Sequence, residues 1–456
     1  MAADNSGVNS LGSPNPGNPT QPDPSLPLAG LRIIDFTVVF AGPYGTMQLA
    51  DWGAEVIRVE STTHFASTTR GMLARPALAT VQAQTGMGMG MPDSEPGERP
   101  WNRSAVFNAH GRNKLGMTVN LRTEEGQEAL ERLVAVSDGL VENNLPQSME
   151  RQGITWERLS KINPKLIMIR MPAFGLDGPY KGYRTWGNHM EAISGHPLIR
   201  TYSDLSPEYA PAGVPSDAAS GIGSALAFLM GKRYLKRTGK GLLIEAPTAE
   251  NFVPLLGEFI MDYSMNGRVW TQMGNNHFYL APHNVYRTQG EDQWVTIACW
   301  NEEQWQALCE RMRRPELADD PRFCDNESRF KNKAELDAII GEWVADKHAS
   351  WVLDQLQIVG VPSGAVINER DAIEDRHLEH RGFFKRMTHP EAGTHKTPMT
   401  PFKSMNNPGV GPRRHSPRLG EDNEYVYKQV LGYSDEEYAE FDKKGHIGMD
   451  FDPSIP

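Results

Sequence analysis

LAGLRIIDFTVVFAGPYGTMQLADWGAEVIRVE, residues 28–60, contains the pattern from which the fold of this chain follows. Its run LRIIDF at 31–36 is short and apolar, which is typical of a buried strand. A Gly42-Pro43 turn comes next, then a helical pattern and a second strand-like run, AEVIRVE, at 54–60. Because a strand, a helix and a strand in this order imply a parallel pair with a right-handed crossover, the stretch predicts the opening unit of a nucleotide-type α/β fold.

Strands and helices continue to alternate beyond this unit. Further strand-like runs lie at residues 117–121, 138–143, 165–171 and 242–247. Helical patterns occupy 123–136 and 148–159, and small residues followed by a long apolar run predict a helix that begins near Pro215. The recurring alternation predicts a doubly wound parallel sheet.

Some segments interrupt this rhythm and indicate the domain organisation. Residues 1–27 are mostly Pro, Gly, Asn and Ser, which predicts a disordered leader before a large α/β domain that begins with residues 28–240. Within that domain, residues 62–104 are expected to form a surface insertion loop. After about residue 260 aromatic and polar residues alternate around turns, a pattern typical of antiparallel strands. A small domain is therefore predicted at 260–330.

Composition excludes several classes of function. The chain has 456 residues and a net charge of −11, with 46 basic against 57 acidic residues, so it lacks the basic footprint of a nucleic-acid-binding protein. Its three cysteines form no CxxC pair, and the histidines have no metal-ligand spacing, which argues against disulfides and metal sites. With no apolar run of roughly 18 residues, no membrane span is expected, and a cytoplasmic location is predicted.

The common catalytic motifs are absent, and one carboxylate is the main candidate. The turn at 41–45 lacks the GxGxxG spacing of dinucleotide-binding proteins, and no Walker A, HExxH or GxSxG motif occurs. Asp217 starts the long predicted helix among small residues. It can be read as a helix cap, or as a nucleophile that is ionised at neutral pH and faces helix amides. Glu191 is a weaker acid–base candidate.

Several ordered segments carry a resemblance to a known family. They are LAGLRIIDFTVVFAGPYGTMQLADWGAEVIRVE (28–60), FNAHGRNKLGMTVNL (107–121), VENNLPQSMERQGITWERLSKINPKLI (141–167), FGLDGPY (174–180) and AGVPSDAASG (212–221). Through them the chain resembles the class III, or CaiB/BaiF-type, CoA-transferase family. That family includes formyl-CoA transferase, carnitine CoA-transferase and the α-methylacyl-CoA racemases. The similarity runs from about residue 28 to 440, in order along the chain.

The resemblance implies a covalent mechanism. Asp217 occupies the place of the family's aspartate nucleophile, which forms an anhydride and then a thioester with coenzyme A. Acyl-CoA is then a substrate, with no permanently bound cofactor, and succinyl-CoA is a plausible donor to a carboxylic acid acceptor. The positions that match the family's CoA contacts are Val39, Ala41, Gly42, Pro43, Asn113, Lys114, Asn143, Asn144 and Arg151.

Three features depart from the family's patterns. Phe40 replaces the glutamine of formyl-CoA transferase, which disfavours oxalate and formate. A glycine-rich substrate lid is matched only weakly, by Gly274, Asn275 and Asn276. The racemases have a His-Asp pair where this chain has Trp186 and Gly187, so two-base proton transfer lacks a partner.

The resemblance also implies an architecture. The family fold is an interlocked dimer, in which a discontinuous Rossmann-like large domain contains an inserted small α+β domain. Residues 345–456 are then expected to return to the large domain. Two alternatives to transfer stay open, an acyl-CoA racemase or isomerase, and a non-catalytic CoA-binding subunit of a heteromeric transferase.

Overall fold

The computed structural model describes residues 23–83, 90–209 and 213–456. Most of the predicted 1–27 leader, and part of the methionine-rich stretch within 62–104, lie outside these residues. The described end of the leader, residues 23–27, forms turns, and Leu26 is buried. The described chain divides into two compact units. The first comprises the residues up to Ser194, Gly213–Leu255 and Phe384–Pro456, and the second comprises the described part of 195–212 and Leu256–Phe383.

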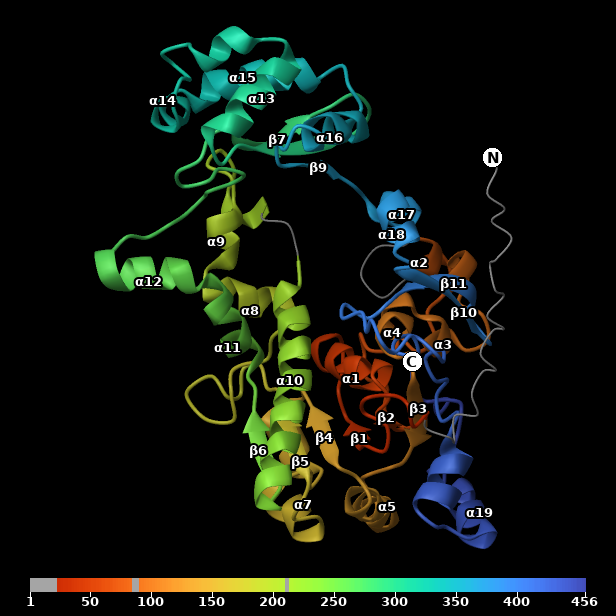
Figure 1. The fold of residues 1–456 in the computed structure, drawn as a ribbon. Helices are drawn as coiled ribbons and strands as arrows, with labels where there is room; N and C mark the ends of the chain where they lie inside the picture. Colours follow the sequence, from red (N-terminus) through yellow and green to blue (C-terminus); the bar gives the residue numbers. More distant parts are fainter. Residues whose placement is uncertain (1–22, 84–89, 210–212) are drawn as a thin grey trace. The chain divides into compact units, whose positions relative to one another are not determined.

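A six-stranded parallel sheet forms the centre of the first unit, which confirms the predicted α/β class (Figure 1). Its order is β3-β2-β1-β4-β5-β6. The strands are β1 (Arg32–Asp35), β2 (Glu55–Glu60), β3 (Lys114–Thr118), β4 (Gly139–Glu142), β5 (Ile167–Arg170) and β6 (Leu242–Glu245). In this topology the strand order reverses between β1 and β4, and ligands bind beyond the carboxyl ends of the strands at such a point.

Two local predictions differ from the structure. Strand β3 begins at Lys114 and not at residue 117, because the Lys114 ammonium is neutralised inside the protein, so a charged residue occupies a buried strand. The helix expected at 148–159 is two helices, since Gly153 adopts a φ of 69° between them. A left-handed residue of this kind ends a helix.

The first unit also contains a set of further helices. They are α2 (Leu78–Gln82), α3 (Pro100–Arg103), α4 (Ala105–His110), α5 (Glu124–Ala135), α6 (Pro146–Arg151), α7 (Trp156–Ile162), α8 (Gly187–Ser194), α11 (Thr248–Phe252) and α19 (Asp435–Lys443), with a π-helix at Tyr425–Val430. A hairpin of β10 (Phe384–His389) and β11 (Gly393–Pro398) completes the unit. In the described parts of the chain, no helix is both long and apolar enough to cross a membrane.

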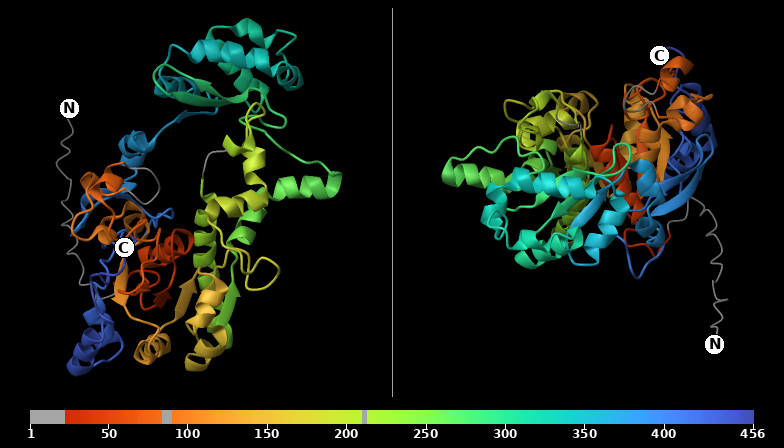
Figure 2. Two further views of the ribbon diagram at one scale, coloured as in Figure 1. Left: turned by 180° about the vertical axis from the view of Figure 1, so that it is seen from behind. Right: turned by 90° about the horizontal axis from the view of Figure 1, so that it is seen from above.

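Two helices pack unusually closely and bring the candidate site together. They are α1 (Ala41–Asp51) and α10 (Pro215–Thr238), which lie side by side in both views (Figures 1 and 2). A Cβ added to Gly45 would lie 2.2 Å from Ser224 Oγ, and one added to Gly221 would lie 2.7 Å from the carbonyl of Ala41. The two helices can approach this closely only because these positions carry no side chain.

Within the described parts of the predicted insertion loop at 62–104, two side chains are packed into the first unit. Arg70 is buried and pairs with Glu60 at the end of β2, with 2.7 Å between Nη2 and Oε2. Trp101 is also buried and stacks edge to face with Phe451, near the end of the chain. These two buried side chains tie the segment to the sheet and to the C-terminal residues.

The second unit contains the predicted 260–330 region and extends beyond it. Its antiparallel sheet is β7 (His283–Arg287), β8 (Trp294–Ala298) and β9 (Ser363–Val366). Because β9 pairs with β8, and helices after residue 330 share the core around Trp305, the chain returns to the first unit at Phe384 and not at residue 345. The helices are α9 (His196–Arg200), α12 (Gly257–Asn266), α13 (Glu302–Met312), α14 (Asn326–Lys331), α15 (Lys333–Val344), α16 (Ala349–Gln357), α17 (Glu369–Glu374) and α18 (Arg376–His380).

Candidate active site

Asp217 lies in the first turn of α10, and its side chain is 7% exposed. The N-cap residue of this helix is Val214, which makes no side-chain capping hydrogen bond. Asp217 is therefore not the cap of this helix. Instead, its carboxylate accepts a hydrogen bond from the backbone N–H of Ala41, the first residue of α1. The carboxylate therefore lies at two helix N-termini, where an anion is stabilised.

Burial controls the protonation of this carboxyl group. It raises the pKa of Asp217 to about 6, against the opposing effect of the Ala41 hydrogen bond, and the negative charge of Glu191 raises it further. Loss of hydration outweighs the favourable backbone dipoles. Above pH 7 the group is still mainly ionised, and it is a stronger base than an exposed aspartate.

Glu191, the weaker candidate, supports the same helix end. It lies on α8 and is buried, and its Oε1 accepts hydrogen bonds from the backbone N–H and the hydroxyl of Ser216, each at 3.3 Å. Ser216 directly precedes Asp217. The carboxylate of Glu191 therefore fixes the first turn of α10, which is a positioning role.

Gly187, the first residue of α8, is in close contact with the candidate nucleophile. A Cβ on Gly187 would lie 1.9 Å from Asp217 Oδ2 and 3.0 Å from Val214 Cγ1. Sequence reasoning noticed this glycine only as a missing racemase residue. The structure shows that no side chain fits here while Asp217 keeps its position.

Two predicted CoA-contact residues, Asn143 and Asn144, hold the loop between β1 and α1. Asn143 Oδ1 accepts from the N–H of Val38 at 2.7 Å, and its Nδ2 donates to the Val38 carbonyl at 2.9 Å. Asn144 Nδ2 donates to the carbonyl of Phe36 at 2.8 Å. Val39 has a φ of 63°, and its N–H donates to Thr69 Oγ1 at 3.0 Å. The backbone of this loop is therefore held in place by hydrogen bonds to the side chains of Asn143, Asn144 and Thr69.

Lys114, predicted to contact CoA, is instead fully buried. Its Nζ donates to Asp35 Oδ2 at 2.9 Å, Thr46 Oγ1 at 2.8 Å and the Pro43 carbonyl at 3.0 Å. These contacts use all three donors of the ammonium group. Burial lowers the pKa of Lys114 to about 8, although Asp35 opposes the shift. In this structure Lys114 ties the first turn of α1 to β1 and presents no donor to a ligand.

The neighbouring Asn113 is similarly engaged inside the protein. Its Nδ2 donates to Asp51 Oδ1 at 2.7 Å and to the Gly411 carbonyl at 2.9 Å. Its Oδ1 accepts from the backbone N–H groups of Arg413 and Arg414, both at 2.8 Å. The predicted contact pair Asn113 and Lys114 thus connects segments of the first unit.

Replacement of Lys114 by Met should lower the free energy of unfolding by about 3 kcal/mol, because Asp35 would keep a buried charge without its closest cationic partner. Urea denaturation followed by tryptophan fluorescence measures this loss. The double variant Asp35→Asn, Lys114→Met should recover part of the stability, since neither charge then remains. A loss below about 1 kcal/mol in the single variant, the range of exposed pairs, would contradict the interpretation.

Phe40 directly precedes Ala41, whose N–H contacts Asp217, and packs against other aromatic rings. It is the N-cap residue of α1, and its ring stacks on His110 with centroids 4.4 Å apart. Burial, assisted by the Lys114 charge, lowers the pKa of His110 to about 4, so this imidazole is neutral at pH 7. The stacking contact with the neutral His110 therefore holds the Phe40 ring in place, as an uncharged surface next to Ala41 in the chain.

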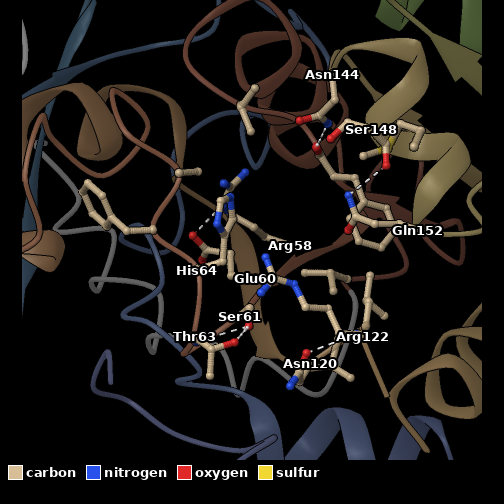
Figure 3. A pocket seen from close by; sticks show the side chains of 18 of the residues that line it. Arg58, Glu60, Ser61, Thr63, His64, Asn120, Arg122, Asn144, Ser148 and Gln152 are labelled. Atoms are coloured by element: carbon tan, nitrogen blue, oxygen red, sulfur yellow. Dashed lines mark hydrogen bonds and ion pairs between the residues drawn. The ribbon is translucent and has the colours of Figure 1, made fainter. Parts of the chain in front are cut away.

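A cavity of about 430 Å³ lies at the carboxyl ends of β1 to β4 (Figure 3). Arg58 and Arg70 contribute to its wall, but both pair with Glu60. Arg122 and Arg151 are exposed cations of the wall, and neither has an ion-pair partner among the described residues. Arg151 was predicted to be a coenzyme contact. Arg122 was missed, although a basic residue just beyond a predicted strand was a usable signal.

The cavity and the nucleophile lie at opposite ends of one short loop. Thr37 and Val38 line the cavity, and the N–H of Ala41 contacts Asp217. Val38 and Ala41 are three positions apart in the chain, a span of at most roughly 11 Å. The predicted residue Val39 belongs to this connection, and Gly42 and Pro43 follow it in the first turn of α1, so the structure brings together the predicted loop, Asp217 and Arg151 in one unit.

The lid candidates lie in the second unit. Gly274, Asn275 and Asn276 line a cavity of about 520 Å³ together with residues of β7, β8 and the start of β9. The hydroxyl of Tyr202 donates to Asn275 Oδ1 at 3.0 Å, and Gly274 has a φ of 55°. The structure thus assigns these three residues to a polar pocket of their own unit.

Comparisons with known proteins agree with this geometry. A family model described as CoA-transferase family III matches residues 28–423. Succinyl-CoA–D-citramalate CoA-transferase from Chloroflexus aurantiacus is 30% identical over 91% of this chain and 97% of its own length. The beta subunit of succinyl-CoA–L-malate CoA-transferase from the same organism is 28% identical over 92% of this chain and 98% of its own length. A CAIB/BAIF family protein from Brucella suis superposes with a TM-score of 0.75 at 28% identity, over 90% of this chain and 100% of that one.

Proposed function

We propose that this chain, which belongs to CoA-transferase family III and is a CoA-transferase, moves coenzyme A from succinyl-CoA to a carboxylic acid. The transfer passes through covalent intermediates on Asp217. One observation carries the proposal. The buried Asp217 carboxylate lies under the Ala41 N–H, at one end of a loop whose other end lines a cavity with two exposed arginines, Arg122 and Arg151.

The cavity suits the nucleotide end of coenzyme A. That end carries phosphate groups, and Arg122 and Arg151 offer exposed guanidinium groups of the kind that bind phosphate. The pantetheine arm would run along residues 38–41 and bring the thioester to Asp217. Asn143 and Asn144 contribute by holding the backbone of that loop.

The reaction begins with attack of an Asp217 carboxylate oxygen on the thioester carbonyl of the donor. The carbon–sulfur bond breaks, leaving a mixed anhydride on Asp217 and free CoA thiolate. The thiolate then attacks the aspartyl carbonyl, which releases the donor acid as its carboxylate and leaves an aspartyl-CoA thioester.

The second half of the reaction reverses these steps with the acceptor. The acceptor carboxylate attacks the aspartyl thioester, giving a new anhydride and CoA thiolate. The thiolate attacks the acceptor carbonyl, and the new acyl-CoA leaves with Asp217 regenerated as a carboxylate. No net proton is consumed. Burial of Asp217 favours the cycle because water would hydrolyse either intermediate.

Relatives and Phe40 support the choice of substrates. Two relatives are named for transfer from succinyl-CoA to a larger acid, citramalate or malate. Phe40 presents an aromatic ring where a polar amide would suit a very small diacid.

An acid panel assayed with succinyl-CoA should show poor turnover of oxalate and formate. Oxalate turnover equal to that of the larger acids would contradict the specificity proposed from Phe40.

Transfer should depend on pH through Asp217. The nucleophile must be ionised, and burial raises its pKa to about 6. A plot of kcat/KM against pH should therefore be flat near pH 8 and fall below an apparent pKa of about 6, tenfold for each further unit. A profile without a fall between pH 7 and pH 5 would show that another group limits the reaction.

A trapping experiment tests the covalent mechanism directly. Succinyl-CoA labelled in the coenzyme A part should leave label on the protein when no acceptor is present, because the aspartyl thioester keeps the coenzyme after the donor acid has left. Hydroxylamine should convert the activated Asp217 carbonyl to a hydroxamate, which peptide mapping would find at this residue. Wild-type protein that turns over substrates without any adduct at Asp217 would contradict the mechanism.

The alternatives receive less support from the site. A racemase would use a proton-transferring side chain at position 187, where the structure leaves no room beside Asp217. A non-catalytic subunit would not require the buried, raised-pKa carboxylate.

The interlocked dimer and the cytoplasmic location remain part of the proposal. A heteromer is the second candidate assembly, since one relative is named as a beta subunit. Analytical ultracentrifugation of the purified chain decides whether it associates with itself.

A further inference from the structure

The last residues of the chain reach the cavity from a distant part of the sequence. Phe451 lines the cavity and is 4% exposed. Its ring packs at near right angles against Phe65, with centroids 5.4 Å apart, and against Trp101, at 5.3 Å. Phe65 is half-buried and also lines the cavity. An aromatic pair from two separate segments therefore forms part of the cavity wall.

Specific contacts hold this C-terminal segment in place. The guanidinium of Arg75 donates to the carbonyls of Phe451, at 2.8 Å, and of Ile455. Arg99 makes two hydrogen bonds to the Asp450 carboxylate, at 2.7 and 3.1 Å. The N–H of Asp452 donates to the carbonyl of Thr62 at 2.9 Å. Figure 1 accordingly places the end of the chain beside α3 and α4.

The aromatic pair lies close to the charged part of the cavity. His64 precedes Phe65, and the positive charge of Arg122 contributes to lowering the pKa of His64, after the larger effect of burial. Figure 3 shows His64 on the side of the cavity opposite Ser148 and Gln152. One wall therefore combines an exposed imidazole, an aromatic ring and a nearby guanidinium. Phosphate and a nucleobase together require a cation and an aromatic surface of this kind.

We propose that Phe451, in the C-terminal segment, is part of the coenzyme site, and that it fixes Phe65 as an apolar platform for the adenine base. The inference rests on the proposed function, because it assumes that the cavity takes the nucleotide end of coenzyme A. It adds a role for Phe65 and for Phe451, which form the wall of the nucleotide subsite together.

Calorimetric titration with free CoA and with adenosine 3′,5′-bisphosphate, the fragment without the pantetheine arm, tests this inference. Phe451→Ala should weaken both ligands by about tenfold, the loss expected when one base–aromatic contact is removed. Phe65→Leu should do the same with less disturbance of folding, since Phe65 is only half-buried. The effect should be equal for the two ligands because they share the adenine.

Two further variants separate this effect from general damage. Ile455→Ala removes a side chain that packs on the same cluster but does not line the cavity, and its affinities should match the wild type. Phe40→Ala, at the other end of the loop, should weaken CoA but leave adenosine 3′,5′-bisphosphate unaffected. Wild-type affinity for the bisphosphate in Phe451→Ala and Phe65→Leu, or an equal loss in Ile455→Ala, would overturn the inference. Failure of the wild type to bind CoA would overturn the proposed function itself.

Discussion

Substitution of Asp217 by Asn should abolish transfer, lowering kcat by about 10⁴-fold or more. The amide keeps the size of the side chain and can still accept the hydrogen bond from Ala41, but it has no anionic oxygen to attack the thioester. Binding of CoA should stay within a few-fold of the wild type, because the cavity residues are untouched. The two measurements together separate chemistry from binding. Near-normal transfer in the variant would reject the nucleophile.

The same variant should not be less stable than the wild type at neutral pH. Burial raises the Asp217 pKa, so the folded state binds this proton more tightly than the unfolded chain does. The ionised group therefore costs stability once the pH rises from about 4 through 6, by up to about 3 kcal/mol. Asp217→Asn should gain stability at pH 8 and none below pH 4. Urea denaturation at both pH values measures the difference, and it excludes unfolding as the cause of lost activity.

Substitution of Gly187 by Ala should reduce kcat by about 100-fold, the scale of a misplacement of roughly 1 Å at a reacting group. The added methyl would lie 1.9 Å from Asp217 Oδ2, far inside contact distance, so the carboxylate must turn away from the Ala41 N–H. The affinity for CoA should change little. The acid limb of the pH profile should also move to higher pH. The Ala41 hydrogen bond lowers the pKa of Asp217, so weakening it lets that pKa rise.

Gly341→Ala is a matched control for this substitution. Gly341 lies in helix α15, and a Cβ there would meet nothing within 4 Å. Its activity should equal that of the wild type, and its stability should be unchanged or slightly higher, as expected for Gly to Ala in a helix. Wild-type kcat in Gly187→Ala would show that Asp217 is free to move without loss, against the geometry described above.

The sequence predicted some parts of the site and missed others for identifiable reasons. Asp217 was predicted as the candidate nucleophile because small residues follow a carboxylate at a helix start and a family motif matched it, and the structure shows this carboxylate buried in the first turn of α10. Lys114 was predicted as a coenzyme contact from its match to the family's motifs, and the structure shows it buried and fully hydrogen-bonded inside the protein. Only the position of Asp35 on β1, two strands away in the sheet, shows that the charge of Lys114 is neutralised internally.

Gly187 and Phe451 could not have been found from sequence alone. Gly187 belongs to the site through the 1.9 Å that would separate its Cβ from a residue thirty positions later. Phe451 reaches the cavity because Arg75 and Arg99 hold the C-terminal segment against residues that precede it by more than three hundred positions. Neither relation leaves a periodic or local signal.

By itself, the sequence determined the parallel α/β architecture and the family, and it singled out Asp217 as the candidate nucleophile. Those features depend on apolar periodicity and short motifs, which involve residues close together in the chain. The tertiary structure alone decided which charges are buried, which glycine makes room for Asp217 and which segments line the cavity. Those features depend on packing between distant segments, where a difference of about 1 Å determines whether a side chain fits.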